Sequence, residues 1–73
     1  REVHLTNREM EILGMLTVGL SSEEICQKCQ ISYSGLKKHN RNIYRKLGVK
    51  SRSEAERMAK RLHLLSNDVH PWD

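Results

Sequence analysis

Apolar residues recur at helical spacing in four stretches of this chain, and turn-forming residues separate the stretches. The pattern predicts helices over about residues 7–18, 22–29, 33–47 and 52–62. The apolar side chains expected to face a common core are Ile12, Leu13, Leu16, Ile25, Cys26, Cys29, Leu36, Ile43, Leu47, Ala55, Met58, Ala59 and Leu62. No stretch alternates apolar and polar residues between turns, so the sequence predicts no strand.

Residues typical of helix ends stand at the borders of these stretches. Three pairs have the spacing of a capping box, in which a hydroxyl and a carboxylate accept hydrogen bonds from free backbone N–H groups. The pairs are Thr6-x-x-Glu9, Ser21-x-x-Glu24 and Ser51-x-x-Glu54. Ser32 is a lone cap for the third helix, while Gly19 and Gly48 end the first and the third.

Only Gln30, Ile31 and Ser32 separate the second predicted helix from the third. A short helix, a tight turn and a longer helix make a helix-turn-helix, whose second helix enters the major groove of DNA. A chain of 73 residues has room for one domain. We therefore expect an all-α fold, a four-helix bundle containing a helix-turn-helix, over residues 1–65, with a flexible tail over 66–73.

Positive charge is concentrated in the third predicted helix and the turn after it. Residues 31–52 carry seven lysines and arginines and no acidic residue, whereas residues 1–30 and 53–73 have net charges of −2 and −1. The basic residues that a helical wheel puts opposite the apolar stripe are Lys37, Lys38, Arg41 and Arg45. Such a face favours nucleic acid, because binding releases counterions from the phosphate backbone. Duplex DNA suits it better than RNA, whose major groove is too narrow and deep to read.

Five motifs, in this order, resemble those of one known family. They are Leu5-Thr6-Asn7-Arg8-Glu9, Gly19-Leu20-Ser21, Leu36-Lys37-Lys38-His39, Asn42-Ile43-Tyr44-Arg45-Lys46-Leu47-Gly48-Val49 and Ser51-Arg52-Ser53-Glu54-Ala55. From about Leu5 to Leu65 the chain resembles the LuxR-type (GerE-like) helix-turn-helix domain of bacterial transcription regulators. The resemblance implies a four-helix, DNA-binding output domain that commonly dimerises through its last helix on a two-half-site operator.

The resemblance also implies which residues contact DNA. Lys37, Lys38 and Arg41 match recognition-helix positions that face base edges, and only arginine can contact guanine O6 and N7 as a planar bidentate fork. The candidate phosphate contacts are Ser21, Ser22, Ser32, Ser34, Arg45, Lys46, Lys50 and Arg52. The candidate dimer residues, on the last helix and just after it, are Met58, Arg61, Leu62 and Leu65. The alternative for Met58 and Leu62 is that they complete the core of the monomer.

The helix-turn-helix departs from the family's pattern in three respects, one of which is Cys26 and Cys29 where a small residue and leucine are typical. Gly35 stands where relatives usually have threonine, which removes a hydroxyl and weakens the helix if the position is interior. Gln30 occupies the turn position where glycine is usual. A positive φ there would therefore cost glutamine more than it costs glycine.

Cys26-x-x-Cys29 has the spacing of a thiol redox pair or of half a zinc site. There is no second cysteine pair, and the four histidines have no ligand spacing, so two buried apolar cysteines are the favoured interpretation. His39 lies at the edge of the apolar stripe and is expected to pack there. A catalytic role is disfavoured, because no nucleophile or carboxylate lies at helical spacing from it. We therefore expect no metal, no cofactor and no enzymatic activity.

The sequence thus predicts sequence-specific binding of double-stranded DNA by a bacterial transcription regulator, as a homodimer on DNA and in the cytoplasm. It has neither an apolar run that could span a membrane nor a signal-peptide pattern. Three alternatives stay open: a basic face that docks onto a protein such as RNA polymerase, a solvated helix face, and a redox or metal module. The chain lacks an initiator methionine, which suggests a piece of a longer protein. Phosphorylation of a receiver domain, an acyl-lactone ligand and a nucleotide switch are all compatible with this type of output domain.

Overall fold

The computed structural model describes residues 3–62, which form four helices and no strand. The helices are α1 (Asn7–Thr17), α2 (Ser22–Cys29), α3 (Tyr33–Leu47) and α4 (Arg52–Arg61). Their bounds agree with the prediction to within one residue, since Val18 and Leu62 are the C-caps of α1 and α4 rather than their last turns. The predicted all-α fold with a helix-turn-helix is confirmed, and the expected tail over residues 66–73 lies outside the described residues.

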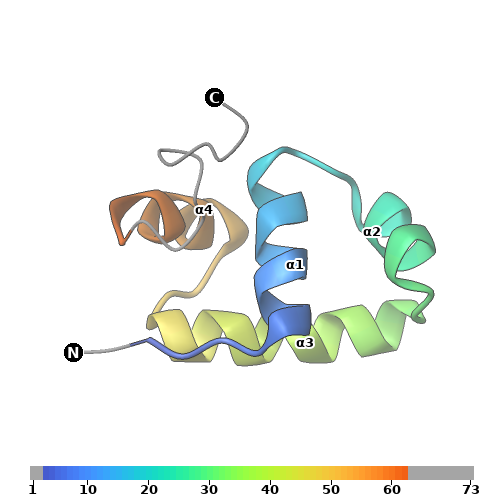
Figure 1. Ribbon diagram of the computed structural model, residues 1–73, viewed down its shortest axis with the longest axis horizontal. Helices are drawn as coiled ribbons and strands as arrows, with labels where there is room; N and C mark the ends of the chain where they lie inside the picture. The colour runs from blue at the N-terminus through green and yellow to red at the C-terminus, as the bar shows by residue number, and fades with distance from the viewer. Residues whose placement is uncertain (1–2, 63–73) are drawn as a thin grey trace.

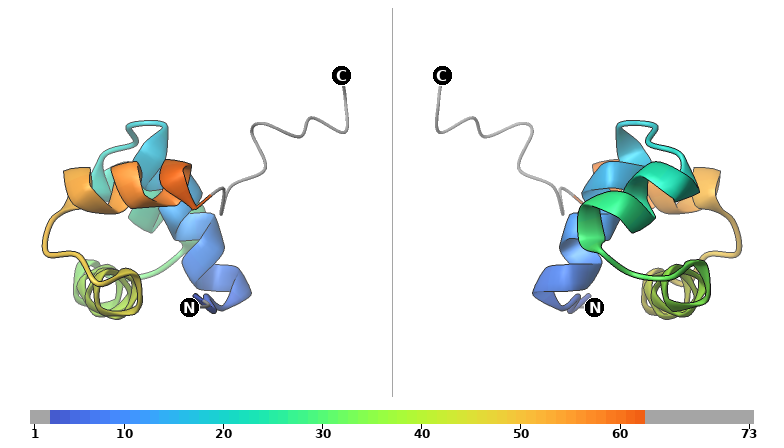
Figure 2. Two further views of the ribbon diagram at one scale, coloured as in Figure 1. Left: turned by 90° about the vertical axis from the view of Figure 1, so that its left-hand side faces the viewer. Right: turned by 90° about the vertical axis from the view of Figure 1, so that its right-hand side faces the viewer.

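The longest helix, α3, lies along one edge of the molecule with the other helices stacked on it (Figure 1). α1 stands across α3 and packs against both α3 and α4. α2 packs near the N-terminal end of α3 and α4 near its C-terminal end. Seen end-on in Figure 2, α3 has the other three helices above it or to one side. The fold therefore leaves one face of α3 uncovered by any helix in residues 3–62.

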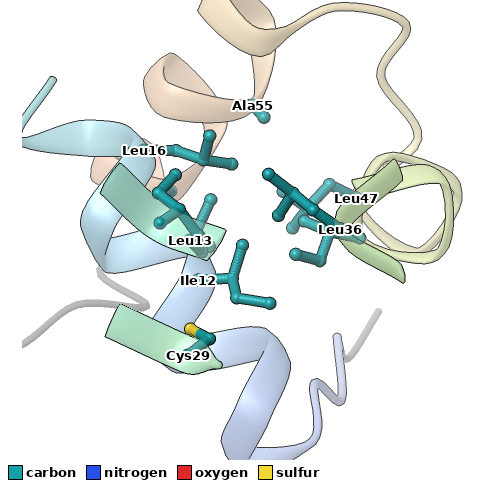
Figure 3. Packing of buried hydrophobic residues seen from close by; sticks show 10 residues of the cluster. Ile12, Leu13, Leu16, Cys29, Leu36, Leu47 and Ala55 are labelled. Carbon is teal, nitrogen blue, oxygen red and sulfur yellow. The ribbon is translucent and has the colours of Figure 1, made fainter. Parts of the chain in front are cut away.

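Ten apolar side chains from all four helices form the core. They are Ile12, Leu13, Leu16, Ile25, Cys29, Leu36, Ile43, Leu47, Ala55 and Ala59. Figure 3 shows Ile12, Leu13 and Leu16 of α1 pointing toward Leu36 and Leu47 of α3. Full burial of a leucine or isoleucine contributes about 1.5–3 kcal/mol, so these contacts hold α1 and α3 together firmly.

Three of the predicted core residues are more exposed than expected. Cys26 and Met58 are half-buried and pack against the core from its margin. Leu62 is 41% exposed, because it follows the last turn of α4. Of the two interpretations of Leu62, completion of the monomer core is therefore wrong.

The first two predicted capping boxes are complete. At the start of α1, the Glu9 amide donates to Thr6 Oγ1 at 3.0 Å and the Thr6 amide donates to Glu9 Oε1 at 2.9 Å. At the start of α2, the Glu24 amide donates to Ser21 Oγ at 3.1 Å and the Ser21 amide donates to Glu24 Oε1 at 2.8 Å. Each pair satisfies two backbone donors that a helix leaves free at its N-terminus.

The third predicted capping box is only half formed. Ser51 Oγ accepts from the Glu54 amide at 3.3 Å, but Glu54 Oε1 accepts from the amide of Lys50 at 2.8 Å, one residue before the cap. The Ser51 backbone is more extended than the caps of α1 and α2, with φ −147° against −68° and −73°. With this backbone, the Lys50 amide and not the Ser51 amide binds the Glu54 carboxylate.

The turn between α2 and α3 contains a glutamine with a positive φ. Gln30 lies in the left-handed region, with φ 56° and ψ 47°, and the Ile31 amide donates to the Cys26 carbonyl at 3.1 Å. Ser32 then caps α3, because its Oγ accepts from the Gly35 amide at 3.1 Å. A Cβ on Gly35 would lie 3.3 Å from that Oγ, so a side chain there would crowd the cap. Three residues thus turn the chain from α2 into α3.

Candidate nucleic-acid interface

The uncovered face of α3 is basic. The four residues predicted to lie opposite the apolar stripe are all exposed, namely Lys37, Lys38, Arg41 and Arg45. Leu36, Ile43 and Leu47 on the other side are buried. α3 contains no acidic residue, so no carboxylate on this helix offsets the positive charge. The outward orientation of these side chains is confirmed.

The dimensions of α3 suit a groove in duplex DNA. Its 15 residues give a length of about 22 Å at a rise of 1.5 Å per residue. Lys37 and Arg41 are one turn apart and lie on the same face. The major groove of B-DNA is about 12 Å wide and admits a helix. Because α3 forms an edge of the domain, the helices packed behind it leave room for a duplex on its open side.

Hydroxyl groups lie at the N-terminal ends of α2 and α3. Ser32 and Ser34 are exposed, with their Oγ atoms 3.1 Å apart. At α2, Ser21 is exposed and Ser22 is half-buried. The amides that the caps leave unbonded, the partial positive charge at a helix start and the hydroxyl donors suit a phosphate oxygen, an attraction that Glu23 and Glu24 in the first turn of α2 reduce.

Two of the four cations predicted to contact phosphates bind partners in distant segments of the chain. Lys46 Nζ donates to Glu9 Oε1 at 2.7 Å and so links the end of α3 to the start of α1. The Glu9 side chain is 5% exposed, and Glu9 is the one charged residue that is buried among residues 3–62. Sequence reasoning gave Glu9 only a capping role, and the partner 37 residues away has no local signature.

Arg52 makes a similar link between α4 and α1. Its Nη2 donates to the carbonyl oxygens of Leu16 at 3.0 Å and Leu20 at 2.7 Å, and its Nε donates to Glu56 Oε2 at 3.1 Å. These carbonyls belong to the last turn of α1 and the loop that follows it. Arg52 therefore donates to carbonyls at and just after the C-terminal end of α1, where acceptors lack intrahelical partners.

The other two cations predicted to contact phosphates face solvent. Lys50 is exposed, and Arg45 is exposed with one hydrogen bond from its Nη2 to Asn42 Oδ1 at 3.3 Å. Both remain accessible to a phosphate. The structure thus separates the predicted set into two surface cations and two cations, Lys46 and Arg52, that join helices.

The environment of Glu9 stabilises its charged form. Burial raises the pKa of this carboxyl, but the hydrogen bonds from Lys46 and from the Thr6 amide outweigh burial, and the net pKa lies below its ordinary value. Burial raises the pKa of the Tyr44 phenol, against the opposing effect of Arg52. Glu9 is buried and Tyr44 is half-buried against the core, so both serve the scaffold.

An open cleft of about 440 Å³ lies beside α4. Its lining residues are Gly48, Val49, Glu54, Arg57, Met58 and Arg61. Two of the predicted dimer residues, Met58 and Arg61, are therefore together in one concave surface, and Leu62 is exposed at the adjoining end of α4. Leu65, the fourth predicted dimer residue, lies outside the described residues.

Cys26 is half-buried and Cys29 is buried, and both are free thiols. His39 is half-buried at the margin of the core face of α3. Over the described part of the chain, no three or more histidine, cysteine or acidic side chains gather as metal ligands would. None of the four helices has the length and apolar character needed to cross a bilayer.

Comparisons with known proteins agree with this geometry. The family described as bacterial regulatory proteins, luxR family, matches residues 3–59. The HTH-type transcriptional regulator MalT of Yersinia pestis (strain Pestoides F) is 41% identical over 58 residues, which is 80% of this chain and 6% of that protein. MalT of Yersinia enterocolitica serotype O:8 is 40% identical over the same share. The chain thus spans a small part of the length of these curated relatives.

A solved structure is similar in fold as well. The crystal structure of the response regulator ChrA, from a heme-sensing two component system, superposes with a TM-score of 0.82 and 38% sequence identity. The match covers 89% of this chain and 32% of that one. From the family match, the relatives and the shared fold, the chain belongs to the luxR family of bacterial regulatory proteins and is a helix-turn-helix DNA-binding domain of transcription regulation.

Proposed function

We propose that this domain binds double-stranded DNA sequence-specifically, with α3 in the major groove, as the output domain of a longer bacterial transcription regulator. The observation that carries the proposal is the open face of α3, where Lys37, Lys38, Arg41 and Arg45 are exposed and no acidic residue interrupts them. A duplex offers both the phosphates that attract such a face and a groove that fits the helix.

Base recognition is assigned to the middle of this face. Arg41 lies near the centre of α3, and its guanidinium can donate to O6 and N7 of one guanine at the same time. Lys37, one turn earlier, and Lys38 beside it are the further candidates for base edges. They lie toward the N-terminal end of the helix, where a recognition helix approaches the bases.

Phosphate contacts set the register around these bases. We assign six residues to these phosphate contacts. They are Ser32 and Ser34 at the start of α3, Ser21 and Ser22 at the start of α2, and the surface cations Arg45 and Lys50. Lys46 and Arg52 remain in the proposal as half-buried positive charges, because Lys46 binds Glu9 and Arg52 binds Glu56 and the end of α1. Their main effect on binding is then to hold α3 and α4 in position.

A second copy of the chain is the proposed partner of α4. Met58 and Arg61 line the cleft beside this helix, and Leu62 projects from its end with 41% of its surface exposed. An isologous contact brings the same patch together from both copies. Such a dimer would place two α3 helices on two half-sites, and it would form in the cytoplasm where the DNA is. A Leu62→Glu variant that bound a duplex with two half-sites as tightly as the wild-type domain does would contradict this contact.

The experiment that tests the base contacts compares one surface cation with another. An operator is first selected from a random library, and affinities are then measured for the selected and a random duplex. Arg41→Ala is expected to weaken specific binding by about 1–3 kcal/mol and to relax sequence preference. The matched variant Lys50→Ala is expected to weaken both duplexes alike. Equal losses on both duplexes for Arg41→Ala would defeat the assignment.

A further inference from the structure

Tyr33 is an exposed aromatic residue at the start of the basic face. It is the first residue of α3, and its side chain is 61% exposed. The other large apolar residues that are exposed in residues 3–62, Val18 and Leu62, lie at the ends of α1 and α4. Tyr44, also on α3, is half-buried and packs against the core, whereas Tyr33 does not pack there. The fold therefore gives no packing reason for an aromatic ring at position 33.

The ring of Tyr33 has a specific neighbour. Lys37 Nζ lies 5.5 Å from the ring centroid, within the range of a cation–π contact. The two residues are one helical turn apart, so the contact forms within α3 and does not depend on another element. Exposed contacts of this kind change an equilibrium by about two- to fivefold.

The contact restricts an otherwise flexible side chain. A lysine ammonium is a point charge on a four-carbon stem and reaches phosphates and bases alike. With the ring on one side, the ammonium of Lys37 keeps fewer positions but still has N–H donors for a DNA acceptor. The restricted positions lie at the N-terminal end of the recognition helix, where side chains reach base edges.

We propose that Tyr33 is a positioning residue for DNA recognition: its ring holds Lys37 and thereby sets the base preference at the position that Lys37 contacts. The chemical target is the O6 and N7 acceptor pair of a guanine. This inference rests on the proposed function, and it adds a determinant of sequence preference that carries no charge of its own.

A double-mutant cycle on the selected operator tests the proposal. The variants are Tyr33→Ala, Lys37→Ala, both together, and Tyr33→Phe, which keeps the ring. Binding is measured on the operator and on its single-base variants, with helix content checked by circular dichroism. Val18→Ala is the matched control, because Val18 is 70% exposed and lies away from α3.

We expect Tyr33→Ala to weaken operator binding by about two- to fivefold and to flatten the preference at one base pair, the same one that Lys37→Ala flattens. Tyr33→Phe should behave as the wild type, and Tyr33→Ala should add nothing once Lys37 is alanine. Additive losses, or a Phe variant as weak as the Ala variant, would overturn the role of the ring. A wild-type domain that enriches no sequence would overturn the proposed function itself, and this inference with it.

Discussion

Replacing Glu9 by glutamine removes one charge from the link between α1 and α3 and leaves the shape of the side chain nearly unchanged. Glu9 Oε1 accepts both from the Thr6 amide at 2.9 Å and from Lys46 Nζ at 2.7 Å. Glutamine keeps an oxygen acceptor, so the hydrogen bond of the capping box can persist. The variant therefore isolates the contribution of the ion pair to stability.

The size of the effect follows from the burial of the two partners. Exposed ion pairs contribute up to about 1 kcal/mol, and breaking a buried pair costs about 3–5 kcal/mol. Here the Glu9 side chain is 5% exposed and that of Lys46 is 31% exposed, so this pair lies between these limits. Since the lysine can turn to water, we expect Glu9→Gln to lower the free energy of unfolding by about 1–2 kcal/mol. In a domain of this size the melting temperature falls by about 4–16 °C.

Thermal and urea unfolding followed by circular dichroism measures this loss. The matched control is Glu11→Gln on the same helix, whose carboxylate is 3.9 Å from Arg8 with a side chain that is 61% exposed. The control should change stability by less than about 0.5 kcal/mol. In a Lys46→Met background the loss caused by Glu9→Gln should disappear or turn into a gain, because the buried carboxylate of Glu9 is then unpaired. Equal stabilities of the Glu9 and Glu11 variants would refute the reasoning.

Three further predictions concern stability. The pKa of Glu9 is lowered in the folded state, so its contribution to the free energy of unfolding is complete above the ordinary carboxyl pKa of about 4.3 and is lost as the pH falls through the lower folded-state pKa. The free energy of unfolding should therefore fall less steeply with decreasing pH in Glu9→Gln than in the wild type, and parallel curves would contradict this. Arg52→Met removes the donors to the Leu16 and Leu20 carbonyls, so urea unfolding should show a loss of about 1–3 kcal/mol. Gln30→Gly should raise stability by about 0.5–1 kcal/mol, because φ is 56° there, while Gln30→Ala should bring no such gain.

The parts of the fold that the sequence predicted depend on short-range signals. Thr6 and Ser21 bind partners three residues away, and the apolar period that defines α3 repeats within each turn. The outward side of α3 follows from the same period, since whatever lies opposite Leu36 and Ile43 must face solvent. Helix bounds and the orientation of the basic face could therefore be predicted without knowing how the helices pack.

Contacts between distant segments could not be predicted in this way. Lys46 and Arg52 were predicted to be surface cations, yet the partners that join them to the first third of the chain are 32 to 37 residues away. At Ser51 the spacing was right, but the carboxylate of Glu54 binds the Lys50 amide because the local backbone is more extended. The pair formed by Tyr33 and Lys37 did have a local signal, an aromatic residue four positions before a lysine on one helix.

The central claim is that the open face of α3 binds duplex DNA. Its most direct test is fluorescence anisotropy of the domain on a labelled random-sequence duplex across a salt series, beside the variant Lys37→Ala/Arg41→Ala. The account predicts a steep linear fall of log affinity with log salt. The slope should be flatter by up to about 2 in the variant, because on a random duplex Lys37 and Arg41 have no matching base and meet phosphates, each of which contributes about 0.9. Binding that was absent at low salt, or that had the same slope in both proteins, would contradict the account and favour a protein such as RNA polymerase as the partner of this face.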